Sequence, residues 1–139
     1  MFRVILVVLA LAFGAPPALA RDVTIVVDLS TQSMAVAVNG EVQYNWAVSS
    51  GKRGYRTPTG NYGPISMHRR YYSQKYDNAP MPYSIFFHGG YAIHGTSHVN
   101  ALGSPASHGC VRLSTEHAAM LYELVRQYGA GNTSIRVKA

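Results

Sequence analysis

The sequence has 139 residues, with 12 Lys and Arg against 6 Asp and Glu, so its formal net charge at pH 7 is +6. A chain of this length supports one domain with a hydrophobic core and excludes two large ones. The positive charge favours anionic partners.

Residues 1–20 have the features of a secretory signal peptide. Arg3 gives a positive start, residues 4–13 are an almost unbroken apolar run, and Ala18-Leu19-Ala20 is a small-residue cleavage site. The run is too short for a transmembrane helix, which needs about 20 apolar residues. An uncleaved N-terminal anchor is the alternative. We predict an exported protein of the periplasm or cell envelope, with residues 21–139 as its domain and no stable membrane insertion after cleavage.

Removing the signal peptide takes away one arginine and leaves 11 basic side chains against 6 acidic ones. An exported protein rarely meets nucleic acid, so we expect no nucleic-acid partner. A cell-wall polymer with free carboxylates fits both the charge and the compartment.

The first half of the domain is predicted to be antiparallel β. Residues 23–29, 33–38 and 41–48 are rich in β-branched residues or alternate between apolar and polar side chains. Asn39-Gly40 separates the last two and predicts a type I′ hairpin turn, which needs positive φ at both central residues.

The pattern breaks between residues 51 and 84. Thr57-Pro58-Thr59-Gly60 predicts a turn, and short strands are expected at residues 62–67 and around residues 85–87. Tyrosines and basic residues are interleaved along this stretch. Part of it is interpreted as a long surface loop, and such loops often serve as lids or binding surfaces. Alternatively, the tyrosines are half-buried strand residues and the basic residues form a solvated face.

Residues 114–128 predict the one clear helix. Ser114 or Thr115 can cap it, apolar residues recur on one face, and Gly129 ends it. Residues 133–137 predict a closing strand. We expect a mainly β domain, with a closed or sandwiched sheet and one covering α-helix near the C-terminus.

Cys110 is the only cysteine in the sequence. Exported proteins usually carry cysteines in pairs, so a lone thiol is either a small buried hydrophobe or is kept for its reactivity. A thiol with a pKa of about 8.5 is only slightly ionised at neutral pH. If Cys110 is a nucleophile, a nearby cation or imidazole is expected to hold it ionised.

Two blocks carry the groups that acyl transfer needs, residues 93–96 and residues 107–113. The N–H groups of His108, Gly109 and Cys110 form an oxyanion hole if they point into one concavity. If the second block is extended, Arg112 shares a face with Cys110 and can favour the thiolate or grip a substrate carboxylate. Spacing leaves open whether His94 or His108 is the base.

Histidines near a cysteine also suggest a zinc site, here built from His94, His98, His108 and Cys110. Glycine at position 95 disfavours the helix that His94-x-x-x-His98 would need, and neither Cys-x-x-Cys nor His-Glu-x-x-His occurs. We predict no metal and no organic cofactor.

Ile-His-Gly-Thr followed by Ser-His-Gly-Cys-Val-Arg-Leu resembles the signature of the L,D-transpeptidase catalytic-domain family of bacterial cell-wall enzymes. Further segments resemble family landmarks in the family's order: residues 27–30, 39–40, 57–60, 81–84 and 90–94. The resemblance covers most of residues 21–139 and implies the family's β-sandwich or barrel-like catalytic domain. No appended wall-binding or immunoglobulin-like domain is expected.

The resemblance implies a reaction. Cys110 would attack the carbonyl between the third and fourth residues of a peptidoglycan stem tetrapeptide, expel the terminal D-alanine and form a thioester. A diamino-acid side-chain amine on a second stem would then attack, giving a 3→3 cross-link. His94 corresponds to the base, with the Gly95 carbonyl orienting its ring.

The resemblance also assigns supporting roles. His108 corresponds to a second, supporting histidine, Ser107 to a residue that helps hold the site, and Arg112 to a basic or polar position after the nucleophile. Tyr83 and Tyr91 are expected as walls of the substrate cleft.

Three fates of the acyl-enzyme remain open on this scaffold: stem-to-stem cross-linking, linking of a protein to the wall, and hydrolysis. The acyl-enzyme can be transferred to an amine, or water can accept it, as in an L,D-carboxypeptidase or in the release of wall-linked protein. A non-catalytic wall-binding module is the alternative of a different class. The partners expected are donor and acceptor stem peptides, and the protein is expected to be a monomer.

Overall fold

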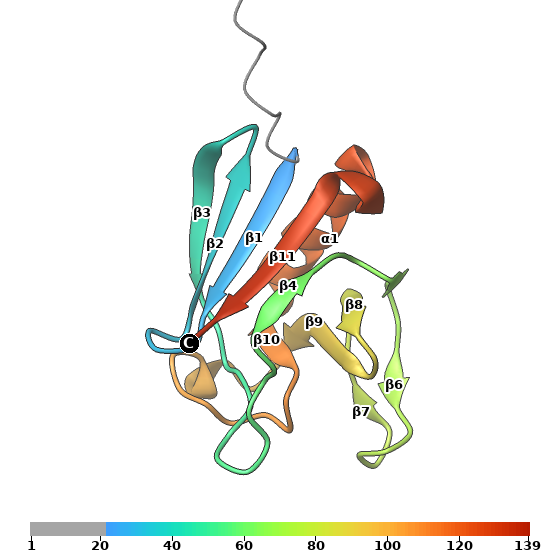
Figure 1. Ribbon diagram of the computed structural model, residues 1–139. Helices are drawn as coiled ribbons and strands as arrows, with labels where there is room; N and C mark the ends of the chain where they lie inside the picture. The colour runs from blue at the N-terminus through green and yellow to red at the C-terminus, as the bar shows by residue number, and fades with distance from the viewer. Residues whose placement is uncertain (1–21) are drawn as a thin grey trace, which may run out of the picture.

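The structure is a computed structural model, and it describes residues 22–139. The predicted signal peptide lies outside the described residues. Within them, two β-sheets and one α-helix enclose the main hydrophobic core (Figure 1). The expectation of a mainly β domain with one covering α-helix is confirmed.

The larger sheet has five strands in the order β3-β2-β1-β11-β4. Its strands are β1 (Val23–Asp28), β2 (Ser33–Val38), β3 (Glu41–Ala47), β4 (Gly60–Tyr62) and β11 (Thr133–Lys138). The predicted hairpin between β2 and β3 is present, with φ of 50° at Asn39 and 84° at Gly40. β1 also pairs in parallel with β11, so the first and last strands of the described chain lie side by side (Figure 1).

The smaller sheet has four strands in the order β10-β9-β8-β5. Its strands are β5 (Ser66–His68), β8 (Ser84–His88), β9 (Tyr91–Thr96) and β10 (Val111–Ser114). β9 and β10 run parallel, whereas β8 is antiparallel to both of its neighbours.

The single strand predicted at residues 62–67 is wrong. β4 ends at Tyr62 in the larger sheet, and β5 begins at Ser66 in the smaller one. Pro64 lies between them and has no N–H to donate to a strand ladder, so the chain leaves one sheet there and enters the other.

The interpretation of residues 51–84 as partly a long loop needs correction, because four short strands lie within this stretch. β6 (Tyr72–Ser73) and β7 (Ala79–Pro80) form a hairpin that stands apart from both sheets, at the lower right of Figure 1. Some tyrosines of this stretch are half-buried and others lie on the surface. Tyr62 and Tyr83 pack against the main core, whereas Tyr55 and Tyr72 are exposed.

The helix α1 (Thr115–Tyr128) begins where predicted, and Ser114 rather than Thr115 caps it. The Ser114 side chain accepts a hydrogen bond from the backbone N–H of His117 at 3.2 Å. Gly129, with φ of 95°, ends the helix. Two short 3₁₀ segments complete the elements, Val99–Ala101 and Ala130–Asn132. No helix in residues 22–139 is long and apolar enough to cross a membrane.

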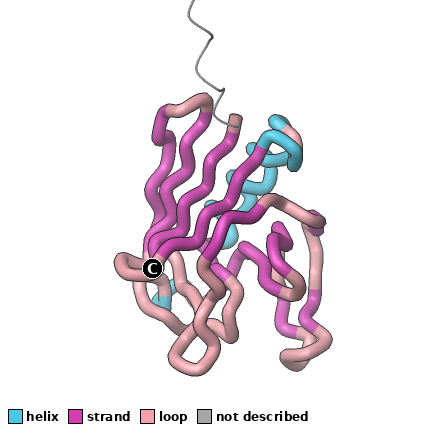
Figure 2. Tube along the Cα trace, in the orientation of Figure 1, coloured by secondary structure: helices cyan, strands magenta, loops and turns pink. Residues whose placement is uncertain are grey.

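Alternation along the strands decides which side chains fill the core. Ile93 on β9, with Val111 and Leu113 on β10, points into the main core between the sheets and α1. The residues between them on each strand therefore point to the opposite face of the smaller sheet. Loops gather beside that sheet, at the lower end of the molecule in Figure 2.

Candidate active site

The outer face of β9 and β10 brings the predicted nucleophile and base together. Cys110 immediately precedes β10, and the parallel register pairs Arg112 with His94. Neighbouring strands lie about 4.8 Å apart, so residues 92 and 94 on one strand border residues 110 and 112 on the other. The prediction that Arg112 shares a face with Cys110 agrees with this register.

The sulfur of Cys110 lies among backbone groups and a small apolar cluster. Its thiol donates to the carbonyl oxygen of Gly90 at 3.9 Å, and the N–H of Ala92 points to the sulfur. Cys110 packs against a cluster of Met81, Phe86 and Ala92. Burial raises the pKa of the Cys110 thiol, outweighing the Ala92 hydrogen bond and the Arg112 charge, which both lower it.

The imidazole of His94 is buried and neutral. The pKa of His94 is lowered to about 4, chiefly by burial; the hydrogen bond to Gly95 opposes this in part, and the nearby Arg112 charge adds to the lowering. The Nδ1 atom lies 2.7 Å from the Gly95 carbonyl oxygen, the contact that the resemblance implied. Because a carbonyl only accepts, Nδ1 carries the proton and Nε2 keeps its lone pair.

These pKa directions correct one expectation from the sequence. A cation or imidazole beside Cys110 was expected to hold the sulfur ionised. Burial instead favours the uncharged form of both groups, since each would lose its hydration when charged. The resting pair is therefore a thiol and a neutral imidazole.

Ser107 organises the nucleophile loop, defined as residues 107–110, which ends at Cys110. Its hydroxyl donates to the carbonyl oxygen of Cys110 at 2.6 Å and accepts the N–H of Gly109 at 3.1 Å. The expectation that three consecutive N–H groups face one concavity is therefore wrong for Gly109, whose N–H is already used. The N–H groups of His108 and Cys110 have no acceptor among residues 22–139.

Glycine at position 109 is required by the backbone. Its φ is +125°, which L side chains rarely adopt, and an added Cβ would lie 2.5 Å from the ring of Tyr91. Tyr91 is thus a direct neighbour of the nucleophile loop, as a cleft residue would be. Tyr83, by contrast, packs its ring against Tyr122 of α1, with the centroids 5.7 Å apart.

A second segment, residues 49–57, holds the nucleophile loop in place through hydrogen bonds to its backbone. Ser49 exchanges two backbone hydrogen bonds with Arg112 on the free edge of β10, and Lys52 donates its N–H to the Ser107 carbonyl at 2.9 Å. The buried Thr57 hydroxyl donates to the Gly109 carbonyl at 2.7 Å. The sequence marked residues 57–60 as a turn and as part of the family resemblance, and neither signal indicated these contacts.

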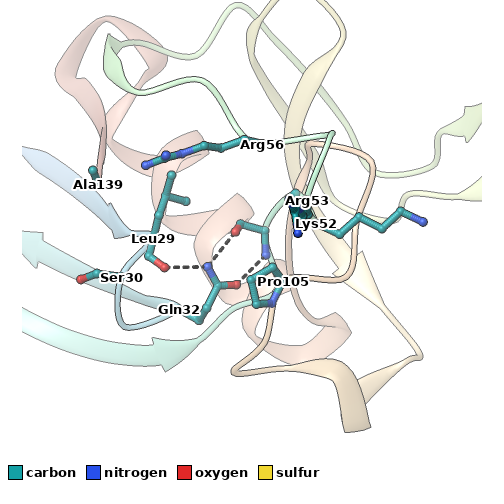
Figure 3. A pocket seen from close by; sticks show the side chains of 10 residues that line it. Leu29, Ser30, Gln32, Lys52, Arg53, Arg56, Pro105 and Ala139 are labelled. Atoms are coloured by element: carbon teal, nitrogen blue, oxygen red, sulfur yellow. Dashed lines mark hydrogen bonds between the residues drawn. The ribbon is translucent and has the colours of Figure 1, made fainter.

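A pocket of about 300 Å³ is lined in part by this segment, with Ser50, Gly51 and Lys52 among its residues (Figure 3). At its floor, the buried Gln32 side chain donates to the Leu29 carbonyl and to the Ser50 hydroxyl, and accepts the Ser50 N–H. Ser50 in turn accepts the N–H of Ser107. Neither Cys110 nor His94 lines the pocket, whose residues support the site rather than form it.

His108 lies between two tyrosine rings. Tyr76 stacks on its imidazole with centroids 4.2 Å apart and planes 7° apart, and Tyr55 meets it edge-on at 4.9 Å. The sequence separates these three residues widely, so no local pattern could have predicted the contact. No group of three or more His, Cys, Asp or Glu that could hold a metal occurs within the described residues.

Comparison with known proteins identifies the family. The model of the L,D-transpeptidase catalytic domain matches residues 22–137, and the chain belongs to this family. A comparison with curated proteins found no match.

Solved structures of similar proteins agree with the fold. An L,D-transpeptidase from Stackebrandtia nassauensis is 28% identical with a TM-score of 0.75, over 85% of this chain and 56% of that one. One from Mycobacterium smegmatis is 23% identical with a TM-score of 0.76, over 85% and 59%. L,D-transpeptidase 3 from Mycobacterium tuberculosis, in complex with a faropenem-derived adduct, is 21% identical with a TM-score of 0.74, over 85% and 60%. The chain thus spans less than two thirds of these relatives' length.

Proposed function

We propose that this protein is a peptidoglycan L,D-transpeptidase of the cell envelope that uses Cys110 as its nucleophile. The proposal rests on one observation, the protonation state of the His94 ring beside Cys110. A neutral ring that donates Nδ1–H to the Gly95 carbonyl has an unprotonated Nε2, which is what a general base needs at neutral pH.

Acylation begins when the Cys110 sulfur attacks the carbonyl carbon between the third and fourth stem residues. Its proton passes to Nε2 of His94, so charge forms only as the sulfur–carbon bond forms. The free N–H groups of His108 and Cys110 are the loop's donors for the oxyanion. When the intermediate collapses, the carbon–nitrogen bond breaks, and His94 protonates the departing amine of D-alanine.

Transfer reverses the roles of the same groups. The side-chain amine of a diamino acid attacks the thioester and loses a proton to His94. The sulfur–carbon bond then breaks, and the proton returns to the sulfur. The product is a 3→3 amide, and the thiol is restored.

The charge of the site supports an anionic stem peptide as substrate. Arg112 stands on the reactive face, and no carboxylate pairs with it among residues 22–139. A guanidinium can hold a carboxylate through two parallel hydrogen bonds. Export to the envelope, predicted from residues 1–20, would place the enzyme with this substrate.

The test is an incubation of residues 21–139 with purified disaccharide-tetrapeptides, followed by mass analysis of the products. A transpeptidase gives cross-linked dimers and free D-alanine, while transfer to water gives tripeptide and free D-alanine without dimers. The Cys110→Ala variant should give neither product. Tripeptide without dimers would reassign the enzyme as a hydrolase, and unchanged tetrapeptide would contradict the proposal.

A further inference from the structure

The aromatic clamp, defined as Tyr55, His108 and Tyr76, joins three separate parts of the chain at the nucleophile loop. Tyr76 comes from the tip of the β6–β7 hairpin. Tyr55 comes from residues 49–57, the segment that is hydrogen-bonded to the nucleophile loop. His108 is two residues before Cys110. We propose that Tyr76 is a positioning residue for acylation, because it fixes His108 and with it the two free N–H donors of the loop.

The hairpin is built to hold Tyr76 in one place. Its N–H donates to the Ser73 hydroxyl at 3.3 Å, and its carbonyl accepts the N–H of Ala79 at 3.0 Å. Asp77 and Asn78 follow with φ of 53° and 51°, a left-handed pair that Asp and Asn tolerate better than other side chains. The tyrosine therefore stands on a tight turn rather than on a loose loop.

The base of the β6–β7 hairpin, at Tyr71 and Met81, is also linked to the nucleophile. The Met81 N–H donates to the Tyr71 carbonyl at 2.8 Å, and Met81 is a member of the apolar cluster against which both Tyr71 and Cys110 pack. The hairpin is thus linked to the nucleophile loop at two places: its base shares an apolar cluster with Cys110, and its tip stacks on His108. Two contacts fix the orientation of the loop better than one.

Lysines extend the clamp at both ends. The Lys52 ammonium lies 5.4 Å from the Tyr55 ring centroid, and the Lys75 ammonium lies 5.4 Å from that of Tyr76. Each cation over an aromatic face stabilises the ring's position. With both tyrosines packed against it, the His108 ring is a structural part of the loop, and the base role falls to His94.

This inference rests on the proposed cysteine acyl transfer, and the test separates the two. Two rates are measured on each variant: acylation by a carbapenem, which develops an oxyanion, and alkylation of Cys110 by iodoacetamide, which does not. The variants are Tyr76→Leu, Tyr76→Phe, and Tyr72→Leu as the matched control. Tyr72 lies on the same hairpin but is 59% exposed.

Removing one oxyanion donor lowers the rate roughly 100- to 1000-fold. If the N–H groups of His108 and Cys110 are only less well fixed, we expect a smaller loss of acylation rate. We expect Tyr76→Leu to acylate at least tenfold more slowly while its alkylation rate stays within twofold. Tyr76→Phe keeps the ring and should match the wild type, as should Tyr72→Leu. Wild-type acylation in Tyr76→Leu, or an equal loss of alkylation, would overturn the inference.

Nuclear magnetic resonance gives a readout that does not depend on catalysis. A ring stacked at 4.2 Å shifts the His108 ring protons upfield, so Tyr76→Leu should move these signals and the amide signal of Cys110, whereas Tyr72→Leu should not. If the wild type is not acylated, the proposed function fails and these shifts still decide on the clamp. Unmoved His108 and Cys110 signals in Tyr76→Leu would refute it.

Discussion

Lowering the pH should destabilise the fold through His94. The folded-state pKa is about 4 and the ordinary value is 6.5, so the folded protein binds this proton less readily than the unfolded chain. The contribution to stability is therefore complete above pH 6.5 and is lost as the pH falls toward 4. A difference of about 2.5 pKa units corresponds to about 3 kcal/mol.

Urea unfolding of residues 21–139 between pH 7.5 and pH 4 measures this loss. The matched variant is His94→Gln, which does not titrate but keeps an N–H that can donate to the Gly95 carbonyl. Other groups, including Asp28, whose pKa is lowered chiefly by its hydrogen bond from the Ser30 hydroxyl, titrate in both proteins. The wild type should therefore lose about 3 kcal/mol more than the variant. Parallel curves would show that His94 is not held neutral by burial.

The same state of the site predicts two different pH profiles. Acylation by a carbapenem should stay level from neutral pH down to about pH 5, because His94 remains an available base. Alkylation by iodoacetamide, which needs the thiolate, should be slow at pH 7 and rise with pH, because burial raises the Cys110 pKa. Fast alkylation at pH 7 would indicate an ionised resting sulfur and contradict the neutral pair.

Two substitutions test the supports of the site. An added Cβ in Gly95→Ala would lie 2.9 Å from the Thr115 Cα, so we expect a loss of about 1–3 kcal/mol in thermal unfolding and slower acylation, whereas Gly131→Ala, with open space around it, should fold normally. Normal stability in Gly95→Ala would mean that α1 can move away from β9. Ser107→Ala removes the acceptor of the buried Gly109 N–H and should cost about 1–3 kcal/mol in urea unfolding. Full acylation by that variant would show that the loop keeps its shape without the hydroxyl.

Local patterns predicted the parts of the fold that local forces determine. The Asn39-Gly40 turn and the helix after Ser114 depend on neighbouring residues, and both are where the sequence indicated. The parallel pairs β1 with β11 and β9 with β10 join distant segments, and nothing nearby in the sequence encodes their partners. The break at Pro64 was missed because the residues on both sides have strand propensity.

The site was predicted as far as its residue types allow. His94, Cys110 and Arg112 meet on one face because the strands alternate, which follows from spacing once β9 and β10 are known to pair. Their protonation did not follow, since it depends on burial that only the packed structure defines. The Tyr76 stack on His108 likewise requires the hairpin to be in place.

The role of Cys110 as nucleophile is tested by intact-mass measurement of residues 21–139 after exposure to a carbapenem. We expect one covalent adduct on the wild type, located on the peptide that contains Cys110, and none on Cys110→Ala. An unmodified wild-type mass, or an adduct that persists in Cys110→Ala, would contradict this role.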